Sequence, residues 1–220
     1  VDTIPAAHAL VLALCGPLLA QLGDPLSLAL PGADTDGIDA FRIVLEQEVV
    51  RYNKLHSAMR HSLEQLTEAI DGRGVMTKSL DAVFHAILVL RVPQEWKDTI
   101  GDVSHKALAS WAAELDKRLK LLREWCAYGP PASFYLPGLI FPQGLLAAIR
   151  QQYGRKNDIA IDTLQLHTQP TKILDPDGLR WIPDIGAYGG VYIHGLVLEG
   201  GRWEAQTGLL KDPVADGDGV

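Results

Sequence analysis

Two residue types that often point to function are scarce in this sequence. Only two cysteines, Cys15 and Cys126, occur in 220 residues, and they lie far apart without CxxC spacing. Disulfide scaffolds carry more and denser cysteines, so we expect two buried thiols in a reducing compartment, although the sequence leaves a disulfide between them open. Basic residues are also outnumbered, with 20 Lys and Arg against 27 Asp and Glu, and they form no basic block. Nucleic acid is therefore not an expected partner.

The motifs of common enzyme classes are missing as well. The sequence contains no GxxxxGK[ST] phosphate loop, no GxGxxG, no GxSxG and no HExxH. His56 and His61 are five residues apart on one predicted helix, whereas metal ligands one turn apart need a spacing of three or four, so we interpret both as surface or boundary histidines. His85 lies among apolar residues and is expected in the core. We therefore predict no catalytic residue, no metal site and no cofactor in this segment.

The first segment is apolar and carries no Lys or Arg before Arg42. Pro5 and Pro17 bracket a run that is too short to span a bilayer, and no basic residue precedes it as one would in a signal peptide. We therefore expect a buried helix here and no membrane partner.

Periodic apolar residues predict four helices up to about residue 156. The strongest signal is a stripe at steps of three and four along one long helix, formed by Phe41, Leu45, Val49, Tyr52, Leu55, Met59, Leu63, Leu66 and Ile70. Gly72 can supply its left-handed cap, and Thr77 can cap a second helix that Pro93 stops. A third helix is predicted over residues 104–126, and a fourth follows Pro142.

Strand patterns begin after the last of these helices. The stretch "IAIDTLQLHT", residues 159–168, alternates apolar and polar residues, and "GVYIHGLVLEGGRW", residues 190–203, forms a second strand region after turn residues. The predicted fold class is α+β, with a mainly α-helical bundle that contains a long N-terminal helix. A small and incomplete antiparallel β subdomain follows it.

Three segments together resemble the C-terminal region of dynein heavy chains over roughly residues 40 to 205. They are "LEQEVVRYNKL" with the later "VPQEW", the stretch from "GPPASFYLPG" to "NDIAIDTLQL", and "GVYIHGLVLEGGRWE". Gly201 departs from the usual alanine. The family-signature residues, which the resemblance implies to be structural or interface positions, are Glu48, Arg51, Asn53, Trp96, Trp125, Phe141, Pro142, Gln143, Asp162, Tyr192, His194, Gly195, Glu199, Gly200, Arg202 and Trp203.

The resemblance implies a domain organisation and a set of partners. Residues 1–38 would be the end of a preceding AAA+ module or a linker, residues 39–157 the helical part of the C-terminal domain, and residues 158–220 its truncated β part. The domain would pack on the AAA+ ring of the same heavy chain, which binds ATP and Mg²⁺ and walks on microtubules toward their minus end. Other dynein subunits are further possible partners, and the expected location is the ciliary or flagellar axoneme.

Two alternatives stay open at this point. One is an isolated helical scaffold that binds a partner through an exposed apolar groove, with no motor attached. The other is a small enzyme that uses His194 together with Glu199 or Arg202, which is the weaker alternative because no Ser, Cys or Asp in that segment is placed to work with the histidine.

Overall fold

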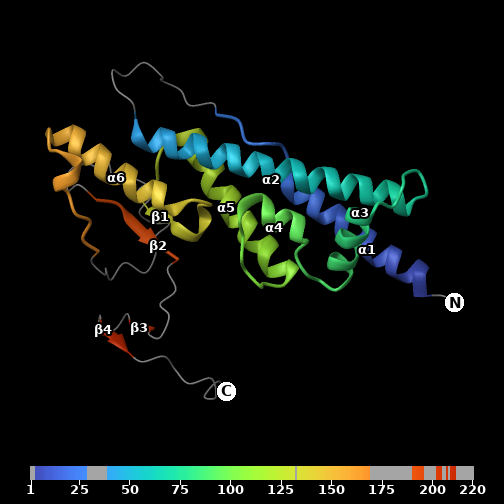
Figure 1. Cartoon of the computed structure of the whole chain (residues 1–220). Coiled ribbons are helices and arrows are strands. Elements are labelled where there is room, and N and C mark those ends of the chain that lie inside the picture. Colours follow the sequence, from blue (N-terminus) through green and yellow to red (C-terminus); the bar gives the residue numbers. More distant parts are fainter. Residues whose placement is uncertain are drawn as a thin grey trace. The chain divides into compact units, whose positions relative to one another are not determined.

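The computed structural model describes residues 3–28, 39–131, 133–168, 190–195, 202–204, 207 and 209–211. It divides into two compact units. Unit 1 comprises Val1–Asp36 and Leu45–Gly129, and unit 2 comprises Gly37–Val44 and Pro130–Val220. Helices dominate the described residues (Figure 1), which confirms the predicted mainly helical class.

The long helix α2, Ala40–Ile70, is built as its periodicity predicts. Eight of the nine residues of its apolar stripe are buried, from Phe41 to Leu66, and only the terminal Ile70 is partly exposed. Gly72 has a φ of +74° and ends the helix, as predicted. The apolar face of α2 therefore supplies much of the core through hydrophobic burial.

Three further helices of unit 1 follow α2. They are α3, Lys78–Leu88, α4, Gln94–Ile100, and α5, Leu108–Tyr128. Thr77 caps α3 as predicted, because its hydroxyl oxygen accepts a hydrogen bond from the Leu80 N–H at 3.2 Å. The sequence pattern does not predict α4, a helix of only seven residues. The buried stripe of α5 contains all six predicted residues, Leu108, Trp111, Leu115, Leu119, Leu122 and Trp125.

Helix α1, Thr3–Leu22, is less buried than predicted. One stripe is in the core, formed by Val11, Cys15, Leu18 and Leu22, whereas the Leu10 side chain is 48% exposed. The stretch Pro5–Leu22 has a mean hydropathy of 1.6 and is long and apolar enough to cross a membrane by length and composition alone. The expectation of a buried helix is therefore confirmed for one stripe of α1 and wrong for its outer face. The prediction that this run is too short to span a bilayer is wrong as well, because the helix continues through Pro17 to Leu22.

Unit 2 contains α6, Pro142–Asn157, which begins at Pro142 as predicted. The 3₁₀ turn η1, Leu136–Gly138, precedes it, and a second turn, η2, Ile161–Thr163, follows it. The prediction of a strand within residues 159–168 is therefore wrong. Gly154 explains the close return of the backbone onto α6, because a Cβ there would lie 2.8 Å from the Ile159 carbonyl oxygen.

The strands of unit 2 are short, and their pairing differs from the prediction. Strand β1, Ser133–Tyr135, pairs with β2, Tyr192–His194, in parallel rather than antiparallel. Strand β3, Arg202–Glu204, pairs antiparallel with β4, Leu209–Lys211. The prediction of an antiparallel β subdomain is therefore wrong for the β1–β2 pair, which is parallel. One strand of this pair, β1, comes from the segment directly after α5.

Candidate functional site

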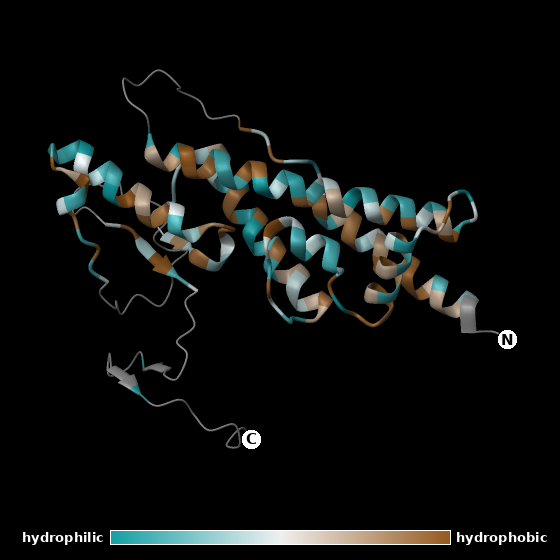
Figure 2. Cartoon of the chain, viewed as in Figure 1, coloured by the Kyte–Doolittle hydropathy of each residue, from teal (hydrophilic) through white to brown (hydrophobic). Residues whose placement is uncertain are grey.

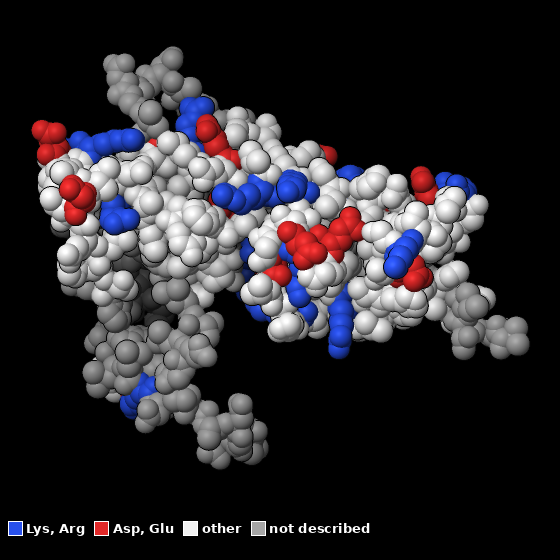
Figure 3. All heavy atoms as spheres, in the orientation of Figure 1, with Lys and Arg blue, Asp and Glu red and all other residues white. Residues whose placement is uncertain are grey.

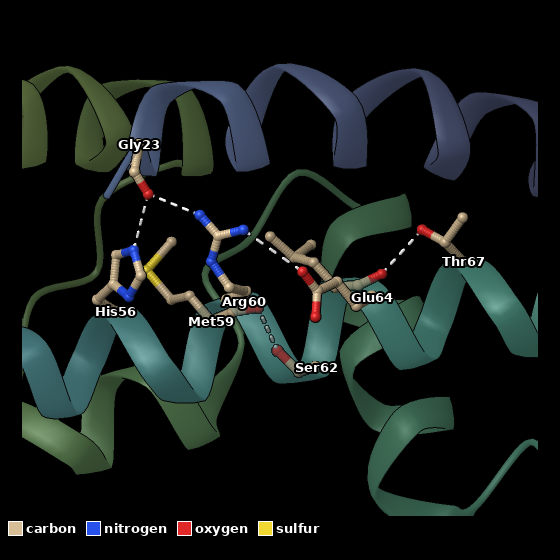
Figure 4. Close-up of polar contacts among 8 residues, drawn as sticks. Gly23, His56, Met59, Arg60, Ser62, Glu64 and Thr67 are labelled. Carbon is tan, nitrogen blue, oxygen red and sulfur yellow. Dashed lines mark hydrogen bonds and ion pairs between the residues drawn. The ribbon is translucent and has the colours of Figure 1, made fainter. Parts of the chain in front are cut away.

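A group of polar side chains on α2 holds the backbone that follows α1 (Figure 4). The His56 Nε2 lies 3.0 Å from the Gly23 carbonyl oxygen, and an Arg60 guanidinium nitrogen donates to the same oxygen at 2.6 Å. From α5, Arg123 donates to the Leu22 carbonyl oxygen at 3.2 Å. These carbonyls lie at the C-terminal end of α1, where the helix leaves acceptors unpaired and a positive charge is favourable.

Asn53 extends this contact by pairing with a single backbone residue. Its side-chain oxygen accepts from the Leu26 N–H at 2.8 Å, and its side-chain nitrogen donates to the Leu26 carbonyl at 2.9 Å. The amide thereby satisfies both backbone polar groups of one residue, as a neighbouring strand would. We call the four side chains Asn53, His56, Arg60 and Arg123, together with the backbone of residues 22–26 that they bind, the α1 clasp.

Gly23 fits the α1 clasp through its conformation and its lack of a side chain. Its φ is +58°, in the left-handed region that favours glycine. A Cβ at this position would lie 3.1 Å from the Arg123 guanidinium. The backbone can therefore turn sharply out of α1 and still leave its carbonyl open to His56 and Arg60.

The histidines of the helices are placed differently from the prediction. His56 is buried, with 3% of its surface exposed, rather than at the surface or boundary. His61 is exposed as predicted. His85 is exposed rather than in the core, and its Nε2 lies 3.5 Å from an Asp81 carboxylate oxygen one turn earlier on α3. His56 follows Tyr52 by four residues and therefore lies on the same face of the helix as the apolar stripe. This spacing is the signal in the sequence that indicates burial of His56.

Two signature residues on α2 lie close to each other. Glu48 is buried, with 1% exposed, and a carboxylate oxygen lies 3.9 Å from an Arg51 guanidinium nitrogen.

Tyr52, one residue after Arg51 on α2, is 0% exposed. Burial raises the pKa of the Tyr52 phenol to about 12, against the smaller opposing effect of Arg123 and Arg60. The phenol therefore stays neutral throughout the physiological range.

The signature tryptophans anchor the core of unit 1. Trp96 is 0% exposed and donates through its indole N–H to the Ser62 hydroxyl at 2.9 Å. It stacks on Trp111, with 6.1 Å between ring centroids. Trp125 is 1% exposed. Because a buried indole N–H needs an acceptor, Trp96 fixes the register of α4 against α2 as well as filling space.

Trp111 makes a second polar contact from the same layer. Its indole N–H donates to Asp102 at 2.7 Å. Burial would raise the pKa of Asp102, but hydrogen bonds from the Ser104 N–H, Trp111 and the Ser104 hydroxyl outweigh burial and hold that pKa below its ordinary value. Asp102 thereby orders the loop between α4 and α5.

In unit 2, His194 has a partner that the sequence did not reveal. Its Nδ1 lies 2.9 Å from the Ser133 hydroxyl, and its ring centroid lies 5.5 Å from that of Tyr135. Both partners are on β1, where Tyr135 is directly opposite His194 in the parallel register. Ser133 is 9% exposed, so its hydroxyl is poorly accessible to a substrate. The pair therefore fits a tie between strands better than a catalytic serine and histidine.

Gly195 follows His194 with a φ of +81°. A Cβ there would lie 2.5 Å from the Tyr135 ring and 2.9 Å from Pro137. Glycine is therefore required at this position both by the backbone conformation and by the close approach of an aromatic ring.

The remaining signature residues are spread over unit 2. Phe141 is 44% exposed and directly precedes Pro142 and Gln143, the first two residues of α6. Asp162 is exposed in η2, and Tyr192 is half-buried in β2. Arg202 and Trp203 are in β3, opposite Lys211 and Leu210, and Glu199 and Gly200 lie outside the described residues. The proposed enzyme pairing of His194 with Glu199 or Arg202 thus stays a prediction.

The remaining candidates for chemistry are metal-ligating side chains, the two cysteines and the charged surface. Among those residues, no group of three or more His, Cys, Asp and Glu side chains could hold a metal ion. Cys15 and Cys126 are both buried free thiols, as predicted, and burial raises the pKa of Cys15 to about 11. Figure 3 shows basic and acidic side chains interspersed on the face in view.

Comparison with known proteins identifies the family. The family model for the C-terminal domain of the dynein heavy chain matches residues 6–216. The dynein-1-beta heavy chain of the flagellar inner arm I1 complex from Chlamydomonas reinhardtii is 35% identical over 204 residues, which cover 92% of this chain and 4% of that protein. Mouse dynein axonemal heavy chain 3 is 37% identical over 80% of this chain and 4% of that protein. The dynein alpha chain of the flagellar outer arm from Chlamydomonas reinhardtii is 32% identical over 78% of this chain.

Proposed function

This chain belongs to the family of C-terminal domains of dynein heavy chains, and we propose that it is the non-catalytic structural and regulatory domain of an axonemal heavy chain. It spans about 4% of the length of the curated relatives it matches. In this proposal it packs on the AAA+ ring of its own heavy chain, and ATP with Mg²⁺ is bound by the ring and not by this segment. The parent protein is an ATP-driven, minus-end-directed microtubule motor of cilia or flagella.

The observation that carries this proposal is the family match over residues 6–216, which covers both units. The relatives are named as axonemal or flagellar dynein heavy chains, and this supports the same setting here. The missing nucleotide-binding motifs agree with a segment that does no chemistry of its own.

The α1 clasp suggests how such a domain transmits displacement. Four side chains bind the backbone at the end of α1, and three of them are on the 31-residue helix α2. Because a packed helix is stiff along its axis, movement of α1 would be passed to α2 through these bonds. The domain would act as a strut between the parts of the motor that it contacts.

The proposal is tested in the full heavy chain by deleting residues 40–220. We expect microtubule-stimulated ATP turnover and gliding velocity to fall together, while basal ATP turnover persists because the catalytic sites lie elsewhere. A heavy chain with the single substitution Lys54→Ala, at an exposed position of α2, serves as the control. Unchanged coupling after the deletion would remove the regulatory role.

The length of the parent protein tests the setting independently. We expect six AAA+ modules with phosphate loops upstream of this segment. A short parent protein without them would instead favour the isolated scaffold.

A further inference from the structure

One buried polar atom of unit 1 has no hydrogen-bond partner among the residues that the structure describes. It is the hydroxyl oxygen of Tyr52, whose side chain is 0% exposed. A buried hydroxyl gives up its hydrogen bonds to solvent, and for this reason the large majority of buried polar groups in native proteins have a partner. A binding partner is therefore expected beside the Tyr52 hydroxyl.

The packing of Tyr52 explains the burial of its ring but not of its hydroxyl. The ring belongs to the apolar stripe of α2, between Val49 and Leu55, which are both buried. Figure 2 shows hydrophobic and hydrophilic residues alternating along this helix. A phenylalanine would fill the same place in the stripe without bringing a polar atom into the core. The hydroxyl is the part of the side chain that needs a partner.

Tyr52 lies next to the α1 clasp. His56 follows it by four residues on α2, with 6.0 Å between the two ring centroids, and Arg60 follows after another four. Residues at this spacing share one face of a helix. Arg60 and Arg123 are also the two charged groups that act on the phenol, since both lower its pKa against the larger effect of burial. The hydroxyl is therefore buried close to the groups of the clasp.

The α1 clasp retains hydrogen-bonding capacity for a small molecule. Arg123 carries several N–H donors, and its hydrogen bond within the described residues is the one to the Leu22 carbonyl oxygen. That oxygen lies at the C-terminal end of α1 and has a second lone pair. A molecule that accepts from Arg123 and Tyr52 and donates to the Leu22 carbonyl would use this capacity and give the hydroxyl its partner.

We propose that the Tyr52 hydroxyl binds an internal water molecule that joins it to the α1 clasp. Water suits this site because it both donates and accepts, and a buried water typically makes about three hydrogen bonds to polar groups that are otherwise unpaired. A small anion could accept from Tyr52 and Arg123. The positive charges of the clasp, however, already face the negative C-terminal end of α1, so a neutral ligand fits better than a further negative charge.

The first experiment removes the hydroxyl in the full heavy chain by Tyr52→Phe. Hydrogen exchange of the peptide that contains residues 22–26 is followed by mass spectrometry. If the hydroxyl binds a water, its loss weakens the clasp, and we expect exchange to be at least about threefold faster. If the hydroxyl has no ligand, the substitution removes an unpaired polar group, and exchange should be unchanged or slower. That second result would overturn the proposal.

Tyr128→Phe is the matched control, because Tyr128 is 76% exposed on α5. We expect this variant to leave the exchange of residues 22–26 unchanged, and an equal acceleration in both variants would contradict a role of the buried hydroxyl. The same measurement on the wild type with acetate in place of chloride tests for an anion. Exchange should be equal in the two salts, whereas faster exchange without chloride would identify an anion as the ligand and overturn the water site.

The second experiment locates the ligand directly, by electron cryo-microscopy of the full heavy chain at a resolution that shows ordered water. We expect a density peak about 2.6–3.0 Å from the Tyr52 hydroxyl oxygen, and no such peak in the map of Tyr52→Phe. A protein side chain at this distance, or no peak in the wild type, would overturn the proposal. The site concerns unit 1 alone, so its failure would leave the regulatory function to be tested by the deletion of residues 40–220.

Discussion

The two units of this domain are stabilised by different kinds of contact. In unit 1, long helices bury continuous apolar stripes, and side chains of α2 bind the backbone after α1. In unit 2, β1 and β2 are each only three residues long. They are held together by their parallel backbone pairing, by the hydrogen bond between Ser133 and His194, and by the close packing of Gly195 against the Tyr135 ring. A two-stranded pair is marginal in water, so these few contacts matter individually.

This difference determines which substitutions should destabilise each unit. A helix core spreads its stabilisation over many buried side chains, so a large effect requires removal of a large anchor. A short strand pair depends on backbone conformation and close approach, so the addition of one methyl group is enough to disrupt it.

The largest expected effect is in unit 1, at Trp96. We expect Trp96→Ala to lower the free energy of unfolding by about 3–5 kcal/mol, because it leaves a large cavity. Chemical denaturation followed by helical circular dichroism measures this loss. Trp96→Phe is the control: it keeps most of the volume and removes the bond to Ser62, so it should cost much less. An equal loss for both would show that the hydrogen bond, and not packing, dominates.

Unit 2 is tested at Gly195. We expect Gly195→Ala to destabilise the β1–β2 pair by about 1–3 kcal/mol, because it combines backbone strain with a clash against Tyr135. Hydrogen exchange of the amides of residues 191–194 reports the local opening. Gly72→Ala is matched in backbone, with a φ of +74° and nothing within 4 Å of the added Cβ. If both variants lose the same stability, crowding by Tyr135 contributes nothing.

The α1 clasp gives an intermediate effect. Asn53→Ala leaves the N–H and the carbonyl of Leu26 without their partner, and we expect a loss of about 1–3 kcal/mol. The Leu26 amide should exchange faster with solvent, whereas Lys54→Ala should change neither quantity. Unaltered exchange at Leu26 in the Asn53 variant would mean that the clasp does not hold this segment in solution.

The smallest effect is the pH dependence from Asp102. Its folded pKa is lower than the unfolded value of about 3.9, so its stabilising contribution is present above that value and is lost as pH falls through the folded pKa. Wild type and Asp102→Asn should therefore differ in unfolding free energy near pH 6 and converge at pH values below the folded pKa. A constant difference across this range would assign the effect to geometry and not to charge.

The helices could be predicted because their signal is local. The stripe from Phe41 to Leu66 and the six buried residues of α5 follow from spacing alone. The cap at Thr77 and the end at Gly72 also depend on neighbouring residues. Helix α4 has only seven residues, which is too few turns for such a pattern, so the sequence does not predict it.

The strand contacts could not be predicted in the same way. Ser133 and His194 are 61 residues apart, and no spacing rule connects them. The alternation in residues 159–168 predicts a strand, but the backbone at Ile159 packs against Gly154 and Ile161–Thr163 forms a 3₁₀ turn instead. The predictions for His56 and His85 are wrong for a related reason. The residues next to a histidine in the sequence do not show which face of its helix another element covers.

The α1 clasp recognises main-chain atoms, and this has a practical consequence for labelling the domain. Its bonds involve the carbonyls of Leu22 and Gly23 and the backbone N–H and carbonyl of Leu26. The side chains of Asp24 and Ser27 are exposed beside it. A fluorophore attached through a cysteine at either position would therefore report on this junction during the motor cycle without replacing any group that forms it.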